Sequence, residues 1–382
     1  MKMKLGYILP VLTIVLAACQ PTSQAAVASE EPRQMAQTPT FTVPPTHIGE
    51  TPQSTPTPEQ TINPLTGLPA ADPALLERRP IMVKVSNYPQ YGRPHAGLSF
   101  ADMVFEYYIG NGTNRFLALY YGQDCSQIGP VRSGRFVDAQ LVPMYGGVLV
   151  YGSADEDTDA EIITTLGNYA ISNFDAPEPA FTGTDTHSVV GVYANSAAIS
   201  QFVAAQGWDN SAPDLPGMVF SYDIPDHGKY ADQLNVLFNY NDRGEWHYDA
   251  GSGKYLRWIE YFEDENDTTY DMIPLVDRVT GSQLAFSNIV VLFAKYTELA
   301  PSRHLIDIIG NNKGKPAYFF RDGQVFEGTW RAKVDDDPIQ FFNDQGEPMS
   351  LKPGNTWIVI AGLKSSYEEI QPKVWELFFN LP

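Results

Sequence analysis

The chain has 382 residues, more than a single hydrophobic core usually serves, so its length indicates two folded domains. Aromatic residues make up 12% of the chain, enough large apolar side chains for substantial cores. Acidic residues outnumber basic ones by 45 to 25, and the formal net charge is −20. This charge disfavours nucleic acid as a partner, because affinity for nucleic acid comes from Lys and Arg that neutralise phosphates.

The first 18 residues have the pattern of a secretory signal peptide. Lys2 and Lys4 precede an apolar stretch from Leu5 to Val15, and small residues lead up to Cys19. The apolar stretch is shorter than the roughly 20 residues that a membrane-spanning helix needs. We therefore expect residues 1–18 to be a signal peptide that is removed on export.

The sequence Leu16-Ala17-Ala18-Cys19 resembles the lipobox of bacterial lipoproteins. In that class the chain is cut before the cysteine, and the new N-terminal cysteine is diacylated. The resemblance implies lipidation at Cys19 and an extracytoplasmic protein that the lipid anchors to the cell membrane. The alternative is an ordinary signal peptide with an accidental cysteine. If Cys19 carries lipid, Cys125 has no disulfide partner, and we expect a free, partly buried thiol there.

Residues 19–62 have the composition of a disordered tether. The stretch 21–64 contains nine Pro and nine Thr, and Phe41 is its only aromatic residue. Such a segment buries too little apolar area to offset the entropy of ordering, and its Thr-Pro pairs favour extended polyproline geometry. We expect a spacer between the lipid and a folded part that begins near residue 63.

The segment 63–216 is predicted to form a mixed α/β N-terminal domain. Alternation of apolar and polar residues predicts strands, and Asn111-Gly112 is a strong hairpin turn between two of them. Predicted strands span 80–87, 102–108, 115–121 and 146–151, and predicted helices span 134–145, 159–166 and 196–206.

The segment 217–382 is predicted to form a strand-rich, mostly antiparallel C-terminal domain, which makes the fold class α+β. Predicted strands span 233–240, 245–261 with a turn at 250–253, 288–296, 314–331 with a turn at Asp322-Gly323, and 356–361. Residues 367–379 are predicted to form a final helix.

Several motifs follow one another along the folded part. They are Arg79-Pro80-Ile81-Met82-Val83, Ala101-Asp102-Met103-Val104-Phe105-Glu106, Thr113-Asn114-Arg115-Phe116-Leu117-Ala118, Ile128-Gly129-Pro130-Val131-Arg132-Ser133-Gly134-Arg135 and Leu351-Lys352-Pro353-Gly354-Asn355-Thr356-Trp357-Ile358. In this order they resemble the YerB-like family of bacterial surface lipoproteins, and the motif that ends at Arg135 is the most specific. The resemblance implies a two-domain fold at the cell surface. It implies no chemistry, because the molecular activity of that family is not established.

Arg132 and Arg135 are the strongest candidates for ligand binding. They flank Ser133 in a loop before a predicted helix, and guanidinium groups bind carboxylates and phosphates through paired hydrogen bonds. We expect Arg115 to join them from a neighbouring strand, with Asp102 and Glu106 as their carboxylate partners. The cluster is either a pocket for a carboxylate or other acid of an envelope component, or a buried ion-pair network.

Other reactive residue types lack a complete catalytic or metal-binding pattern. We expect the Ser133 hydroxyl to cap the following helix, and His187 to make a structural or ligand hydrogen bond. The scattered His residues predict no metal site, and no cofactor is expected. The acidic runs 155–161 and 263–267 are predicted to be solvated loops, with calcium binding as the less favoured reading.

These observations favour a non-enzymatic envelope protein that binds a cell-wall component or an envelope protein. The first alternative is a cell-wall hydrolase whose site lies between the two domains. Its candidate residues are Asp102, Glu106, Arg132, Arg135 and His187. The second alternative is a solute-binding lipoprotein, which is disfavoured because the chain lacks two similar α/β lobes.

Replacing Cys19 with Ala is expected to abolish incorporation of labelled fatty acid and to release the protein from the membrane fraction. The reason is that each buried methylene contributes roughly 0.8 kcal/mol to membrane affinity. We expect the acyl chains to be the only source of membrane affinity in this protein. Fractionation after a salt wash measures the effect. Equal membrane retention of Cys19→Ala and the unaltered chain would contradict lipid anchoring.

Overall fold

The computed structural model describes residues 60–184, 188–264, 268–334 and 337–381. Its first sheet has twelve strands and runs β19-β18-β17-β15-β21-β2-β3-β1-β4-β5, with β16 beside β15 and β9 beside β18. The strands are β1 (Ile81–Ser86), β2 (Met103–Gly110), β3 (Thr113–Tyr120), β4 (Val148–Tyr151), β5 (Ala170–Ser172), β9 (Lys229–Tyr230), β15 (Asn288–Ala300), β16 (Arg303–Asp307), β17 (Asn311–Arg321), β18 (Gln324–Ala332), β19 (Gln340–Asn343) and β21 (Thr356–Gly362).

A second sheet has seven strands in the order β13-β12-β11-β10-β23-β22, with β14 beside β12. These strands are β10 (Gln233–Asn239), β11 (Asp242–Asp249), β12 (Lys254–Tyr261), β13 (Asp271–Pro274), β14 (Ala285–Phe286), β22 (Ser366–Gln371) and β23 (Val374–Phe378). Two short pairs complete the strands of the described residues: β8 (Val219–Phe220) with β20 (Ser350–Leu351), and β6 (Phe181–Thr182) with β7 (Tyr193–Ala194).

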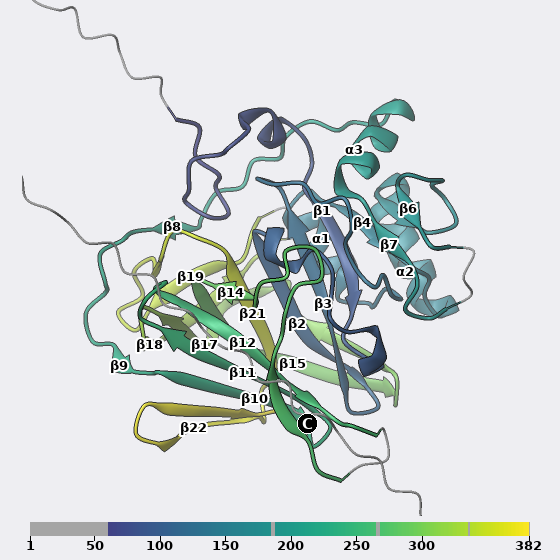
Figure 1. Ribbon diagram of the computed structural model, residues 1–382. Coiled ribbons are helices and arrows are strands. Elements are labelled where there is room, and N and C mark those ends of the chain that lie inside the picture. Colours follow the sequence, from purple (N-terminus) through teal and green to yellow (C-terminus); the bar gives the residue numbers. More distant parts are fainter. Residues whose placement is uncertain (1–59, 185–187, 265–267, 335–336, 382) are drawn as a thin grey trace, which may run out of the picture. The chain divides into compact units, whose positions relative to one another are not determined.

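The helices gather near β1, β4 and β5, at one end of the first sheet (Figure 1). They are α1 (Asp138–Met144), α2 (Glu156–Leu166) and α3 (Ser196–Ala205), with the 3-10 turns η1 (Pro73–Glu77), η2 (Gln90–Gly92), η3 (Leu98–Phe100) and η4 (Gly167–Tyr169). Asp155 caps α2 by accepting a hydrogen bond from the Thr158 N–H, and Asn195 caps α3 in the same way through Ala198. No helix of the described residues is long and apolar enough to cross a membrane.

Strand β21 joins the two halves of the chain within the first sheet. It lies between β2 and β15 and is parallel to both, so that Thr356 is in register with Met103 on one side and Asn288 on the other. All seven residues of β21 are buried, as expected for a strand covered on both faces. The first sheet therefore contains strands from before and after residue 216, where we expect the domain boundary. The position of that boundary stays a prediction.

The two faces of the first sheet meet different partners. Side chains alternate along a strand, so neighbours on β2 point in opposite directions. Tyr107 contacts Asp138 of α1, whereas Glu106 pairs with Arg257 of the second sheet. Helices thus cover one face of β2 and the second sheet covers the other.

A buried ion pair and two tryptophan side chains hold the two sheets together. Arg257 Nη2 lies 2.9 Å from Glu106 Oε1, and both side chains are fully buried. The Arg257 guanidinium packs over the rings of Trp246 and Trp357, at 4.9 and 5.4 Å from their centroids. Trp357 donates to the second Glu106 oxygen at 2.6 Å. Gly244 makes room for the guanidinium, because a Cβ there would lie 2.1 Å from Nη2.

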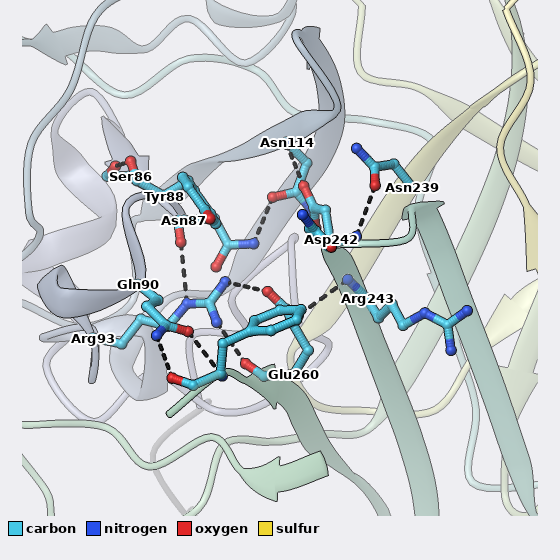
Figure 2. A network of polar contacts seen from close by, with 12 residues as sticks. Ser86, Asn87, Tyr88, Gln90, Arg93, Asn114, Asn239, Asp242, Arg243 and Glu260 are labelled. Atoms are coloured by element: carbon cyan, nitrogen blue, oxygen red, sulfur yellow. Dashed lines mark hydrogen bonds and ion pairs between the residues drawn. The ribbon is translucent and has the colours of Figure 1, made fainter. Parts of the chain in front are cut away.

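A second polar network ties the loop after β1 to β12 (Figure 2). Arg93 donates to the Glu260 carboxylate at 2.7 Å, to the Glu260 carbonyl at 2.8 Å and to the Asn87 carbonyl at 3.1 Å. Gln90 exchanges two hydrogen bonds with the backbone of Phe262. Through Arg93 and Gln90 this network joins the N-terminal and C-terminal parts of the folded chain.

The α+β class is confirmed, and the hairpins at Asn111-Gly112, 250–253 and Asp322-Gly323 form as predicted. The predicted helix at 367–379 is wrong, since these residues form the antiparallel pair β22–β23. Pro372 explains the difference, because a proline inside a helix removes a hydrogen bond and clashes with the preceding turn. Here it lies in the turn between the strands, and Trp375 and Leu377 are buried in alternation. The predicted helix 134–145 is shorter and begins only at Asp138.

Removing one member of the buried pair should destabilise the fold strongly. Glu106→Leu is expected to cost about 3–5 kcal/mol of unfolding free energy, because it leaves the Arg257 charge buried without a carboxylate. The double variant Glu106→Leu/Arg257→Met should recover part of that loss. Urea denaturation measures both.

The matched control is the exposed pair between Lys229 and Glu327, where Lys229→Ala should cost about 1 kcal/mol or less. A Glu106→Leu variant that lost no more stability than this control would contradict the role assigned to the buried pair.

Candidate functional site: an arginine cluster beside the first helix

The three arginines predicted from the sequence converge on one turn of the chain. Arg115 on β3 donates from Nη1 to the Ser133 carbonyl at 2.8 Å. Arg135 donates from Nη1 to the Gly134 carbonyl at 2.7 Å. The Arg132 N–H donates to the Lys84 carbonyl on β1 at 2.9 Å, which fixes the loop against the first sheet.

The Arg132 guanidinium has no hydrogen-bond or ion-pair partner among the residues that the structure describes, and its Nε is buried without an acceptor. Arg115 and Arg135 bond to backbone carbonyls through their side chains and form no ion pair within the same residues. The side chains of the three arginines therefore keep donors available for an acidic ligand.

Three residues of this site were missed by the sequence reading. Lys84 on β1, Tyr107 on β2 and Asp138 at the start of α1 are fully buried together. Lys84 Nζ lies 3.1 Å from Asp138 Oδ1, and the Tyr107 hydroxyl contacts both groups. Asp138 also accepts a hydrogen bond from the Arg135 N–H at 2.7 Å, so it links the lysine to the arginine loop.

Burial governs the electrostatics of the cluster. It lowers the pKa of Lys84 to about 7, against the opposing effect of Asp138. Burial, followed by repulsion from Arg135 and Arg132, lowers the pKa of Arg115 well below its usual value. Lys84, Arg115 and Arg135 thus lie near Asp138, and Arg132 lies near Arg115 and Arg135. An anion would relieve the repulsion between these basic groups.

Ser133 contributes through its backbone. Its carbonyl accepts from Arg115 and, at 3.4 Å, from Arg135. The prediction that its hydroxyl caps the next helix is wrong, because α1 begins at Asp138 and its N-cap residue is Val137.

The structure does not bring Asp102 and Glu106 to the arginines, which differs from the expectation. Asp102 accepts hydrogen bonds from Asn63, Tyr121 and Gly122, and burial raises its pKa to about 6. It lines a cavity of about 400 Å³ that also exposes Lys254 and Lys352. Glu106 points to the second sheet because it follows the strand alternation opposite to Tyr107.

Two family models cover most of the folded part of the chain. The model described as "Protein of unknown function (DUF3048) N-terminal domain" matches residues 65–209, and the corresponding C-terminal domain matches residues 234–358. The chain belongs to the DUF3048 family. The first of these matches contains all three arginines, Lys84, Tyr107 and Asp138.

The comparisons with individual DUF3048 relatives agree with this assignment. The chain is 27% identical over 308 residues to the protein named "Putative lipoprotein YerB" of Bacillus subtilis (strain 168), a match over 78% of this chain and 85% of the relative. It is also similar to the crystal structure of the YerB protein from Bacillus subtilis. The TM-score is 0.62 at 25% identity, with 79% of this chain and 97% of the other covered. The resemblance to the YerB-like family is confirmed.

Two further carboxylates of this DUF3048 chain are buried close to each other. Asp242 and Glu260 lie in the second sheet, and burial raises the pKa of both, with repulsion from Glu260 and Glu106 adding to the effect on Asp242. Their exposed fractions are 2% and 1%, and Glu260 is bound by Arg93 (Figure 2). Asp242 accepts a hydrogen bond from the Asn114 N–H at 2.6 Å, so both carboxylates connect the two halves of the chain.

The structure describes some of the remaining predicted sites, and others lie outside the residues that it describes. Cys125 is free and buried, as predicted. The acidic run 155–161 is the cap and first turns of α2 and not a solvated loop. The described residues contain no group of three acidic, His or Cys side chains suited to a metal ion. Cys19, His187 and most of the predicted tether lie outside the described residues.

The lowered pKa of Lys84 should appear in the pH dependence of stability. The unfolded lysine keeps its proton up to about pH 10, whereas the folded one releases it near pH 7. The unfolded state thus binds more protons between these values, so this residue makes stability rise as the pH increases from about 7 to 9. Lys84→Met should flatten that rise in urea denaturation.

Lys313 is exposed and serves as the matched control, since Lys313→Met should leave the pH dependence unchanged. An identical rise in Lys84→Met and the unaltered chain would show that Lys84 is not the titrating group.

Proposed function

We propose that this protein is a membrane-anchored extracytoplasmic lipoprotein that binds an acidic group of a cell-envelope component through Arg115, Arg132 and Arg135. The anchor is the lipidated Cys19, and the similarity to a protein named as a lipoprotein supports it. The ligand is a carboxylate or phosphate carried by a wall polymer, a peptide or an envelope protein.

The excess of positive charge in the cluster carries this proposal. Lys84, Arg115 and Arg135 lie near Asp138 and Arg132 lies near the other two arginines, in a chain whose net charge is −20. Buried cations without counter-charges are costly, so a fold that keeps them must offset the cost or gain a function from them. Arg132, with no partner among the described residues, is the side chain best placed to meet a ligand.

The fixed orientation of the guanidinium groups favours a role in ligand binding over a purely structural role. Backbone carbonyls hold Arg115 and Arg135 in fixed directions, which lowers the entropic cost of binding an anion. The site would recognise charge and planar oxygen pairs, because a guanidinium group matches carboxylate and phosphate geometry.

Titration calorimetry of the full chain with glucuronate, N-acetylalanine and inorganic phosphate tests the proposal and separates the three sources of acid. Arg132→Ala should weaken binding by about tenfold or more, because a charge-assisted hydrogen bond contributes about 1.5–3 kcal/mol. It should change stability little, since the guanidinium has no partner to lose. Binding should also weaken as salt concentration rises.

Lys313→Ala removes an exposed charge elsewhere and should bind as the unaltered chain does. The proposal fails if none of the three anions binds, or if Arg132→Ala and Lys313→Ala bind equally well. A large loss of stability in Arg132→Ala without any loss of binding would assign the cluster to the scaffold.

A further inference from the structure

A groove of about 580 Å³ lies beyond the ends of two parallel strands. Its lining includes Tyr151 at the end of β4 and Ser172 at the end of β5, and the two strands are parallel neighbours. In open α/β sheets, ligands bind outside the carboxyl ends of the strands. Residues of α2 and of the end of α3 form the remaining walls, and the volume is in the range of small-molecule sites.

Aromatic side chains line this groove and one of them is almost fully exposed. Phe174, in the loop after β5, has an exposed fraction of 82%. Trp208 and Phe202 also line the groove and support each other edge to face, with ring centroids 5.9 Å apart. Large exposed rings cost free energy in water, so a ring held in a groove indicates a binding surface.

Two carboxylates in the groove are oriented by the strand ends. Asp159 accepts a hydrogen bond from the Tyr151 hydroxyl at 2.8 Å through Oδ1. Asp175 accepts from the Ser172 N–H at 2.7 Å and the Ser172 hydroxyl at 2.6 Å, both through Oδ2. In each case the hydrogen bonds between described residues engage one oxygen and leave the other for a ligand.

The chemistry of the lining restricts the ligand. Among the residues that the structure describes, no Lys or Arg lines the groove, and the amide groups of Asn168 and Gln206 add to its two carboxylates. An anion would be repelled there, and a plain hydrocarbon would leave the carboxylates without donors. A sugar ring can interact with both the aromatic rings and the carboxylates of the lining. Its C–H face packs on the negative face of an aromatic ring, and its hydroxyl groups donate to carboxylates.

We infer that this groove binds neutral sugar residues of a glycan, with Phe174 and Trp208 as stacking surfaces and Asp159 and Asp175 as hydroxyl acceptors. This inference stands without the proposed function. The two sites are nonetheless adjacent, because the Gly134 N–H donates to the Ser153 carbonyl and the Gly152 N–H donates to the Arg132 carbonyl. A glycan that carries an acidic group could occupy both.

Calorimetric titration of the full chain with three tetrasaccharides tests the inference: β-1,4-linked N-acetylglucosamine, cellotetraose and maltotetraose. At least one is expected to bind. Phe174→Ala and Asp175→Asn should each weaken that binding by about tenfold, as expected for one lost stacking contact or charge-assisted hydrogen bond. Phe174→Ala suits the purpose because so exposed a ring contributes little to folding.

Tyr222→Ala is the control, since Tyr222 is 72% exposed and does not line the groove. Arg132→Ala should keep sugar binding, which separates failure of this inference from failure of the arginine site. The inference is overturned if no tetrasaccharide binds at about 10 mM, or if Phe174→Ala binds as tightly as Tyr222→Ala. Binding of tetralysine, lost in Asp175→Asn and without any sugar binding, would also overturn it by making the groove a cation site.

Discussion

The buried contact between Glu106 and Arg257 is the constraint on which the arrangement of this fold depends. Neither charge can be removed from water alone without a cost of several kcal/mol, so each requires the other to be in place. Because Glu106 belongs to the first sheet and Arg257 to the second, this requirement fixes how the sheets face each other. Trp246 and Trp357 enclose the pair and exclude water, which strengthens the attraction between the charges.

The same alternation that sends Glu106 to the second sheet sends Tyr107 to the helices. One strand thus supplies the inter-sheet ion pair on one face and the Lys84–Asp138–Tyr107 contact on the other. The arginine cluster depends on that second contact, because Asp138 receives the N–H of Arg135 and anchors the loop. Lys84 and Arg115 are buried on the helix side of the first sheet, whereas Arg132 and Arg135 are only half-buried.

Local sequence signals predicted the local structure well. Turn pairs such as Asn111-Gly112 and Asp322-Gly323 have a backbone preference that does not depend on distant residues, and they formed the expected hairpins. The segment 367–379 was misread because its apolar spacing suits both a helix and a strand. Only Pro372 and pairing with β10, which is distant in sequence, decide between them.

The candidate site was predictable only in part, for a related reason. Arg132 and Arg135 lie in one motif, and Arg115 lies in a strand recognisable by its alternation, so their residue types suggested a cluster. Lys84 and Asp138 look like surface residues in a single sequence, because burial depends on which strands and helices cover them. Asp102 and Glu106 were expected to be carboxylate partners of the arginines, but the face of each side chain follows from pairing across the sheet.

The central position of β21 has a consequence for how the chain acquires its fold. This strand comes from residues 356–362, yet it fills the gap between β2 and β15 in the first sheet. Until those residues arrive, the edge of β2 presents unpaired backbone groups, which is a template for association with other chains. Contacts so distant in sequence also slow folding, because loop closure must precede them. The N-terminal strands therefore wait for almost the whole chain before their sheet is complete, and a truncation before residue 356 would leave that edge open permanently.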